Sequence, residues 1–185
     1  MSDLARPGRA VRVPLGDDGR ALRDAQLYAL LGEYQNTVVR STHLDVVTQE
    51  LIRLRCARQH DCRICQTLRL TDAQLSGVNA DMESKIDYYE SSDLSERHKT
   101  ALRLVDAFIW RPADISDELV AQAHEQFTDE ELAEILVDIT KWSTQKIHVT
   151  LGIDGADHLE VDDRGVAYFA FGDDGKVARI SADLG

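Results

Sequence analysis

Two cysteines separated by two residues are the feature of this sequence that most directly suggests redox or metal chemistry. They stand in the stretch Cys62-Arg63-Ile64-Cys65. Asp61, directly before them, is a good N-cap residue, so we expect Cys62 to open a helix, and the positive end of a helix dipole favours a thiolate. One thiol could then attack an oxidant, and the other, one helical turn away, could resolve the product as a disulfide.

The same spacing places a permanent positive charge beside the cysteines. Positions i, i+3 and i+7 of a helix share one face, so we expect Cys62, Cys65 and Arg69 to line one side of the helix. Three cysteines in 185 residues are not a disulfide framework. In a reducing compartment, such a pair indicates either redox chemistry or half of a metal site.

Amphipathic helices are predicted on both sides of the cysteine pair, because apolar residues recur at i, i+3, i+4 and i+7. The predicted helices span residues 22–38, 45–60, 62 onward, 71 onward, 95–112, 116–127 and 128–152. We expect the last two to form an antiparallel hairpin. Residues 82–93 fit neither pattern.

After Gly155 the apolar period changes from 3.6 to 2, which indicates strands. Three short strands are predicted, at residues 159–161, 166–170 and 177–179. They cannot bury a core alone, so they must pack on the helices, on the N-terminal arm or on a second subunit. We therefore divide the chain into an N-terminal arm, an all-α helical domain and a small C-terminal β-meander, at residues 1–20, 21–155 and 156–185.

The charge and hydropathy of the chain exclude several classes of partner. The net charge of −12 repels phosphate backbones, so we expect no nucleic acid partner. No apolar run approaches the roughly 20 residues that span a bilayer, and the N-terminal stretch has no apolar signal core. We expect a cytoplasmic protein that contacts no membrane.

Glu50 stands twelve positions before Cys62, at the start of the stretch Glu50-Leu51-Ile52-Arg53-Leu54-Arg55. A Glu, eleven residues and a CxxC together resemble the core of the alkylhydroperoxidase D-like and carboxymuconolactone decarboxylase family. The resemblance covers residues 22–153, and the decarboxylases of the family lack the CxxC. It implies an all-α fold, a homotrimer or higher oligomer and, in the redox-active members, peroxide reduction with electrons from a protein thiol donor.

The resemblance also implies roles for individual residues. Cys65 would be the thiol that attacks peroxide, Cys62 the resolving thiol and Glu50 the proton acceptor. Redox-active members carry a His four residues after the second Cys, and this sequence has Arg69 there. A guanidinium, with a pKa above about 12, can stabilise a thiolate but cannot act as a base. His60 could stand in for the missing base.

Each of these residues also has a purely structural interpretation. The two thiols could be buried and inert, and Cys56 is best explained as a small packed residue within its helix. Glu50 could be an ion-pair partner of one of three arginines, Arg53, Arg55 and Arg69. A zinc site would need two thiolates and histidines from among His43, His60 and His98.

These observations together favour a thiol-dependent oxidoreductase, a peroxidase or disulfide reductase, that uses Cys62 and Cys65 without a cofactor or a metal. The partners expected are further copies of the chain in a trimer or hexamer, a protein thiol electron donor and a small peroxide substrate. Two alternatives remain open: a non-catalytic helical oligomer that binds a ligand or partner, and a decarboxylase-like enzyme on the same scaffold.

Overall fold

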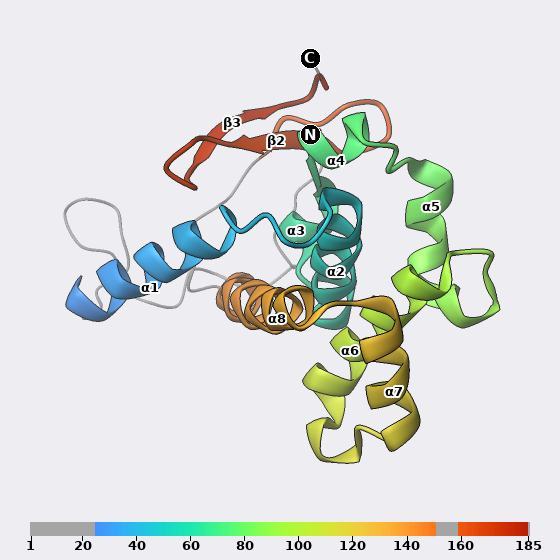
Figure 1. Cartoon of the computed structure of the whole chain (residues 1–185). Coiled ribbons are helices and arrows are strands. Elements are labelled where there is room, and N and C mark those ends of the chain that lie inside the picture. The colour runs from blue at the N-terminus through green and yellow to red at the C-terminus, as the bar shows by residue number, and fades with distance from the viewer. Residues whose placement is uncertain (1–24, 151–158, 185) are drawn as a thin grey trace.

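Helix α2 (Val46–Gln59) lies at the centre of the computed structural model and leads into the cysteine pair (Figure 1). The Asp45 carboxylate caps this helix by accepting a hydrogen bond from the backbone N–H of Thr48 at 2.8 Å. Helices α8 (Asp129–Thr150) and α6 (Glu96–Trp110) pack against α2. Because of this packing, most of α2 is buried, including two charged residues, Glu50 and Arg53.

The structure describes residues 25–150 and 159–184, so the predicted arm at residues 1–20 lies outside it. The remaining helical segments are α1 (Ala25–Val38), α3 (Arg63–Thr67), α4 (Thr71–Leu75), α5 (Ala80–Ser84), η1 (Lys85–Ser91), η2 (Pro112–Asp114) and α7 (Asp117–Gln126). The strands are β1 (Leu68–Leu70), β2 (Ala167–Phe171) and β3 (Val177–Ser181). The all-α class with a small C-terminal sheet is confirmed.

Helices α6 and α8 begin with side-chain caps where the sequence predicts them. Ser95 accepts a hydrogen bond from the backbone N–H of His98 at 3.2 Å and so begins α6. Before α8, Thr128 and Glu131 form a reciprocal capping box, with backbone-to-side-chain distances of 2.8 and 3.3 Å. Residues 82–93, which fit neither pattern, hold the end of α5 and the 3₁₀ segment η1.

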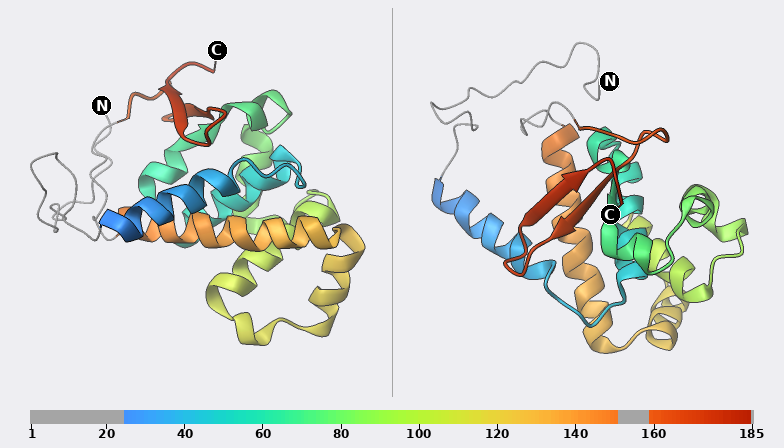
Figure 2. Two further views of the ribbon diagram at one scale, coloured as in Figure 1. Left: turned by 60° about the vertical axis from the view of Figure 1, so that its left-hand side comes forward. Right: turned by 90° about the horizontal axis from the view of Figure 1, so that it is seen from above.

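The partner of α7 differs from the prediction. Helix α7 lies beside α6, as two views show, and α8 runs from the end of α7 across α2 and α1 (Figures 1 and 2). The expected hairpin of residues 116–127 and 128–152 is therefore wrong, because the inward face of α8 packs on α2. No helix in the described ranges is long and apolar enough to cross a membrane.

The sheet takes its third strand from the segment after the cysteines. Strands β2 and β3 form the predicted antiparallel hairpin, but residues 159–161 form no strand. Instead β1 pairs with β2 in parallel, with Leu68 opposite Ala167 and Leu70 opposite Phe169. The sheet lies on the side of the helices away from α7 (Figures 1 and 2). The Phe169 ring of β2 lies 5.2 Å from the Arg53 guanidinium, so the sheet covers the part of α2 that bears Arg53.

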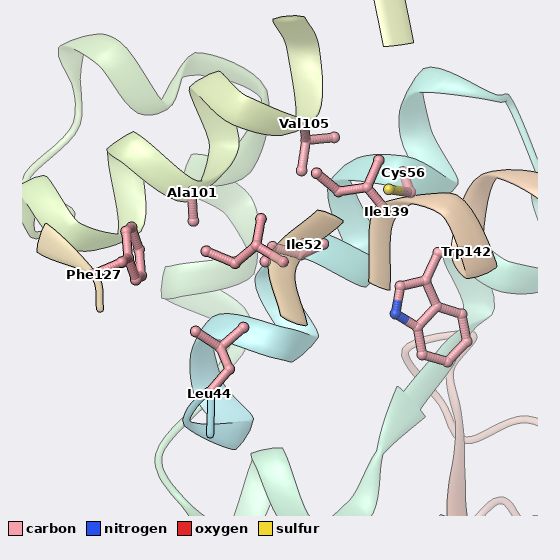
Figure 3. Packing of buried hydrophobic residues seen from close by; sticks show 9 residues of the cluster. Leu44, Ile52, Cys56, Ala101, Val105, Phe127, Ile139 and Trp142 are labelled. Atoms are coloured by element: carbon pink, nitrogen blue, oxygen red, sulfur yellow. The ribbon is translucent and has the colours of Figure 1, made fainter. Parts of the chain in front are cut away.

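The main apolar core lies where α2, α6 and α8 meet. Ile52 and Cys56 of α2 face Ile139 of α8, and Val105 of α6 closes the same cluster (Figure 3). All four are fully buried. Trp142 of α8 extends the cluster toward the sheet, where its ring lies 6.5 Å from that of Phe171. The core thus joins the helices to the C-terminal sheet.

Candidate active site

Cys62 and Cys65 lie at disulfide distance. The two residues are joined as a disulfide, with their Cα atoms 5.3 Å apart. Asp61 takes a left-handed backbone conformation, with a φ of 49°, and Cys62 itself caps α3. The backbone N–H of Cys65 donates to Cys62 Sγ at 3.3 Å. The prediction that Asp61 caps this helix is therefore wrong, and the sulfur takes the capping position instead.

The two cysteines are both buried but differ in the exposure of the whole residue. Cys62 is fully buried against Ala57, whereas Cys65 keeps 8% of its surface accessible. The backbone N–H of Cys62 donates to the carbonyl oxygen of Ala57 at 2.9 Å, which fixes the turn after α2. A reagent from solvent therefore reaches Cys65 more readily than Cys62.

Glu50 forms a buried ion pair with Arg53, one turn along α2. The guanidinium donates to both carboxylate oxygens, at 2.5 and 2.7 Å. It also donates to the carbonyl oxygens of Cys65 at 3.1 Å and Leu68 at 2.5 Å. The backbone N–H of Leu70 donates to Glu50 at 3.1 Å. Of the three arginines that could pair with Glu50, Arg53 is thus the partner, and the pair connects α2 to the cysteine segment.

Arg69 does not share a helical face with the cysteines, because α3 ends at Thr67 and Arg69 lies on β1. Its guanidinium forms an ion pair with Glu83 of α5 at 2.8 Å. It also donates to the backbone carbonyl oxygens of Gln66 and Leu68, at 2.6 and 2.9 Å. The predicted common face of Cys62, Cys65 and Arg69 is therefore wrong, since a strand replaces the second helical turn.

His60 lies at the C-terminal cap of α2, two residues before Cys62. Its backbone carbonyl oxygen accepts a hydrogen bond from the Thr150 hydroxyl at 2.8 Å. Burial and the charge of Lys146 lower the pKa of its imidazole, and its Nε2 atom is buried without a hydrogen-bond partner among the described residues. His60 is therefore placed near the pair as a neutral imidazole.

Comparison with known proteins identifies the fold. The structure is similar to that of protein ATU0492 of Agrobacterium tumefaciens, with a TM-score of 0.61 and 20% sequence identity. The match covers 74% of this chain and 94% of the ATU0492 chain. That protein is of unknown function and is described as a candidate antioxidant defence protein AhpD. The chain has the AhpD-like fold.

Comparison by sequence finds relatives that are longer than this chain. Two uncharacterized proteins of Mycobacterium tuberculosis, MT2376 and Rv2313c, are each 37% identical to it over 127 residues. The match covers 68% of this chain and 45% of each relative, so the chain spans less than half their length. No family model matches the sequence.

Helix α8 carries four buried charged residues that the sequence analysis missed: Glu134, Asp138, Lys141 and Lys146. Lys146 is 1% exposed, and burial, together with the charge of Arg53, lowers its pKa to about 7. Burial likewise lowers the pKa of Lys141. Burial and the nearby Glu134 raise the pKa of Asp138 to about 7. Lys146 continues an apolar stripe, since it lies four residues after Trp142, seven after Ile139 and eleven after Ile135. That periodicity could have revealed its burial.

A small cavity is lined both by Asp138 of α8 and by the Glu50–Arg53 pair. It has a volume of about 30 Å³ and is lined in part by Glu50, Arg53, Asp138 and Trp142. Asp138 Oδ2 and Trp142 Nε1 are buried and have no hydrogen-bond partner among the described residues. A space of this size and polarity suits one or two water molecules.

The described residues contain no group of three or more His, Cys, Asp or Glu side chains arranged to hold a metal ion. Cys56 is fully buried in the core, and burial raises the pKa of its thiol to about 11. It is therefore a packed residue, as the sequence indicates. The chemistry that the arrangement can support is that of the Cys62–Cys65 pair.

Proposed function

We propose that this protein is a thiol-dependent oxidoreductase whose Cys62 and Cys65 alternate between a dithiol and a disulfide. The observation that supports this most directly is the pair itself, held at disulfide distance at the start of α3. Its Cα separation of 5.3 Å lies within the range of protein disulfides. The AhpD-like fold agrees with a redox role.

The difference in residue exposure supports different tasks for the two thiols. Cys65, the more accessible, is the nucleophile: its thiolate attacks the distal oxygen of a hydroperoxide, the O–O bond breaks and an alcohol leaves after protonation. Cys62 then attacks the sulfur of the resulting sulfenic acid, which forms the disulfide and releases water. A protein dithiol reduces the disulfide by exchange and becomes oxidised itself. The reverse of this exchange, in which the Cys62/Cys65 dithiol reduces a disulfide of a protein substrate and is itself oxidised, would make the chain a disulfide reductase.

The neighbouring groups support this cycle in different ways. Glu50 remains our proposed proton acceptor, and His60, a neutral imidazole two residues before Cys62, is a second candidate. Arg53 positions the pair through the Cys65 carbonyl oxygen. Arg69 fixes the segment after the cysteines through Glu83 and two backbone carbonyl oxygens. Its proposed electrostatic effect on the thiolate would thus act from β1.

A thiol titration tests the proposal. We replace Cys56 by Ser so that two thiols remain, reduce the protein, remove the reductant and add one equivalent of hydrogen peroxide. Both thiols should disappear, with an intramolecular disulfide detected by mass. In the Cys65→Ser variant the remaining thiol should react much more slowly, whereas Cys62→Ser should yield a trapped sulfenic acid. Two thiols that persist through the peroxide treatment would overturn the proposal.

We further propose a homo-oligomer, a trimer or hexamer, as the working form, with a protein thiol donor and a small peroxide as partners. Light scattering gives the mass of the assembly. One observation favours the non-catalytic alternative. Arg69, which stands where redox-active members of the family carry a His, forms an ion pair with Glu83. The rate of reaction with iodoacetamide at pH 6 separates the two functions, since a structural pair reacts slowly and a functional pair reacts fast.

A further inference from the structure

The small cavity beside Asp138 brings a second buried carboxyl group next to Glu50. Glu50 and Arg53 of α2 line it together with Asp138 and Trp142 of α8. Its volume of about 30 Å³ leaves room for one or two water molecules. The other lining residues are Gln49 and three apolar residues, Val39, Leu70 and Phe171. A water in this space therefore has few polar groups to bind besides the two carboxyl groups and the indole.

Two polar atoms of α8 are buried here without a hydrogen-bond partner among the described residues. They are Asp138 Oδ2 and Trp142 Nε1. Asp138 and Trp142 stand four positions apart and so share one face of α8, and the Trp142 ring lies at the edge of the apolar cluster (Figure 3). A buried polar group left unpaired costs about 1–3 kcal/mol. One water that accepts from the indole N–H and donates to the carboxylate removes both costs.

Glu50 can bind the same water. Arg53 donates to each of its carboxylate oxygens, and the backbone N–H of Leu70 donates to Oε1 only. Among the described residues, Oε2 thus accepts a single hydrogen bond and keeps a second lone pair. A water between Glu50 Oε2 and Asp138 Oδ2 connects the two carboxyl groups.

Glu134, one turn before Asp138 on α8, is a contrasting case. Its carboxylate oxygens accept four hydrogen bonds of 2.6–3.1 Å, from the side chains of Ser41 and Gln49 and the backbone N–H groups of His43 and Leu44. It is not among the described residues that line the cavity. Glu134 is therefore committed to holding the segment before α2, whereas Asp138 keeps an oxygen for the water.

The charges around Asp138 suit a group that takes up and releases a proton. The ionisable groups that face it come from three helices: Tyr34 of α1, Glu50, Arg53 and Cys56 of α2, and Glu134, Lys141 and Lys146 of α8. Burial, and then the charge of Glu134, raise the pKa of Asp138 to about 7, although the two lysines oppose this shift. A carboxyl group with a pKa close to the working pH exchanges protons readily in both directions.

We propose that Asp138 is a positioning residue of the redox cycle, which holds a water on Glu50 and takes from it the proton that Cys65 releases. This inference rests on the proposed function. The Cys65 S–H bond breaks, the proton passes to Glu50 and through the water to Asp138, where an O–H bond forms. When the O–O bond of the peroxide breaks, the proton returns by the same route to the alkoxide, so the cycle neither gains nor loses protons.

The ion pair on α2 gives the physical reason for a second carrier. A proton that stays on Glu50 neutralises the partner of Arg53 and leaves a buried guanidinium without its counter-charge, which is costly. Transfer of the proton to Asp138 restores the Glu50–Arg53 pair while the thiolate attacks.

The rate of thiol oxidation at two pH values tests the proposal. We reduce the full chain carrying Cys56→Ser, add excess hydrogen peroxide and follow the loss of thiols in a single turnover. At pH 8.5, where Asp138 is ionised, Asp138→Asn should slow the reaction about tenfold, less than the roughly 100-fold effect of a direct base. At pH 6, where Asp138 is mostly protonated, the two rates should agree within about twofold. Asp129→Asn, an exposed change at the start of α8, should alter neither rate.

A second variant and a spectrum support the kinetic test. Trp142→Phe removes the indole N–H that holds the water and keeps an aromatic ring, so it should slow the reaction about threefold at pH 8.5 and leave it unchanged at pH 6. The infrared difference spectrum of the reduced protein between pH 6 and 8.5 should show the loss of a protonated carboxyl group. That signal should be absent from Asp138→Asn.

The outcomes separate this inference from the redox proposal. Equal slowing of Asp138→Asn at both pH values would show a structural role only, and an unchanged rate at pH 8.5 or a missing carboxyl signal would equally overturn the inference. In each of these cases the Cys56→Ser protein still forms its disulfide, and the redox cycle stands. If that protein forms no disulfide at either pH, both proposals fall together.

Discussion

Arg53 donates a hydrogen bond to the backbone carbonyl oxygen of Cys65 at 3.1 Å. The same guanidinium is paired with Glu50, whose carboxylate is fully buried. The Arg53 guanidinium also lies over the Phe169 ring, 5.2 Å from the ring centroid. The charge pair on α2 is therefore in contact with both the cysteine segment and the sheet that covers it.

Removal of one partner of this pair should be costly. Arg53→Met leaves the Glu50 carboxylate buried without a counter-charge, so we expect the free energy of unfolding to fall by about 3–5 kcal/mol. The double variant Glu50→Gln with Arg53→Met removes both charges of the pair and should lose less. Urea unfolding of the wild type, both single variants and the double variant measures the difference.

An exposed arginine gives the matched control for this cycle. Arg179→Met on β3 removes a charge at the surface and should change stability by less than about 0.5 kcal/mol. If Arg53→Met is equally mild, the pair does not connect α2 to the cysteine segment in the way that the distances indicate.

Cys56 should be chemically silent in the folded protein. Burial raises the pKa of its thiol to about 11, so at pH 8 only a minute fraction is thiolate, and the core excludes reagents. The reduced native protein should therefore react with iodoacetamide first at Cys65, more slowly at the fully buried Cys62, and at Cys56 only after unfolding. Peptide mass mapping identifies the sites, and fast labelling at Cys56 would contradict its place in the core.

The sequence was sufficient for the helical elements because their signals are local. The Thr128–Glu131 capping box, the Ser95 cap and the apolar stripe of α8 need no tertiary information, and each is found where it is predicted. The hairpin of β2 and β3 follows equally from period-two alternation and a Gly-containing turn.

The elements that the sequence did not predict depend on contacts between distant segments. Leu68–Leu70 becomes a strand only because β2 lies beside it, a hundred residues later in the chain. That pairing ends α3 and takes Arg69 off the expected face. Within the site, the CxxC and the link from Glu50 to an arginine could be predicted, but the choice of Arg53 depends on a buried position that spacing alone does not fix.

Lys146 should make stability depend on pH. Its pKa in the folded protein, about 7, lies below the ordinary value of 10.5, so between these pH values the unfolded chain holds a proton that the folded chain lacks. Stability should therefore rise with pH from 7 to 9, by at most about 1.4 kcal/mol per unit from this residue. Below pH 7 the Lys146 amine is protonated in both the folded and the unfolded chain. The folded protein then carries the full free-energy cost of burying that positive charge.

Lys146→Met removes this titration. The variant should be more stable than the wild type at pH 7, and its stability should rise less steeply between pH 7 and 9. A residual slope is expected, because Lys141 is shifted in the same direction. Lys176→Met, at an exposed position, serves as the control. Parallel stability curves for the wild type and Lys146→Met, from urea unfolding at several pH values, would contradict the burial of Lys146.

Two glycines with nearly the same backbone conformation test how the sheet rests on the helices. Gly175, in the turn between β2 and β3, has a φ of 75°, and a Cβ there would lie 2.0 Å from the carbonyl oxygen of Asn36 on α1. Gly165 has a φ of 77°, and a Cβ there would have no atom within 4 Å.

Gly165→Ala should therefore cost only the strain of the left-handed backbone conformation, about 1–2 kcal/mol. Gly175→Ala adds a clash with the backbone of α1, and we expect a loss of about 2–5 kcal/mol. Thermal unfolding of the two variants side by side measures the difference, and equal losses would mean that the turn does not pack on α1.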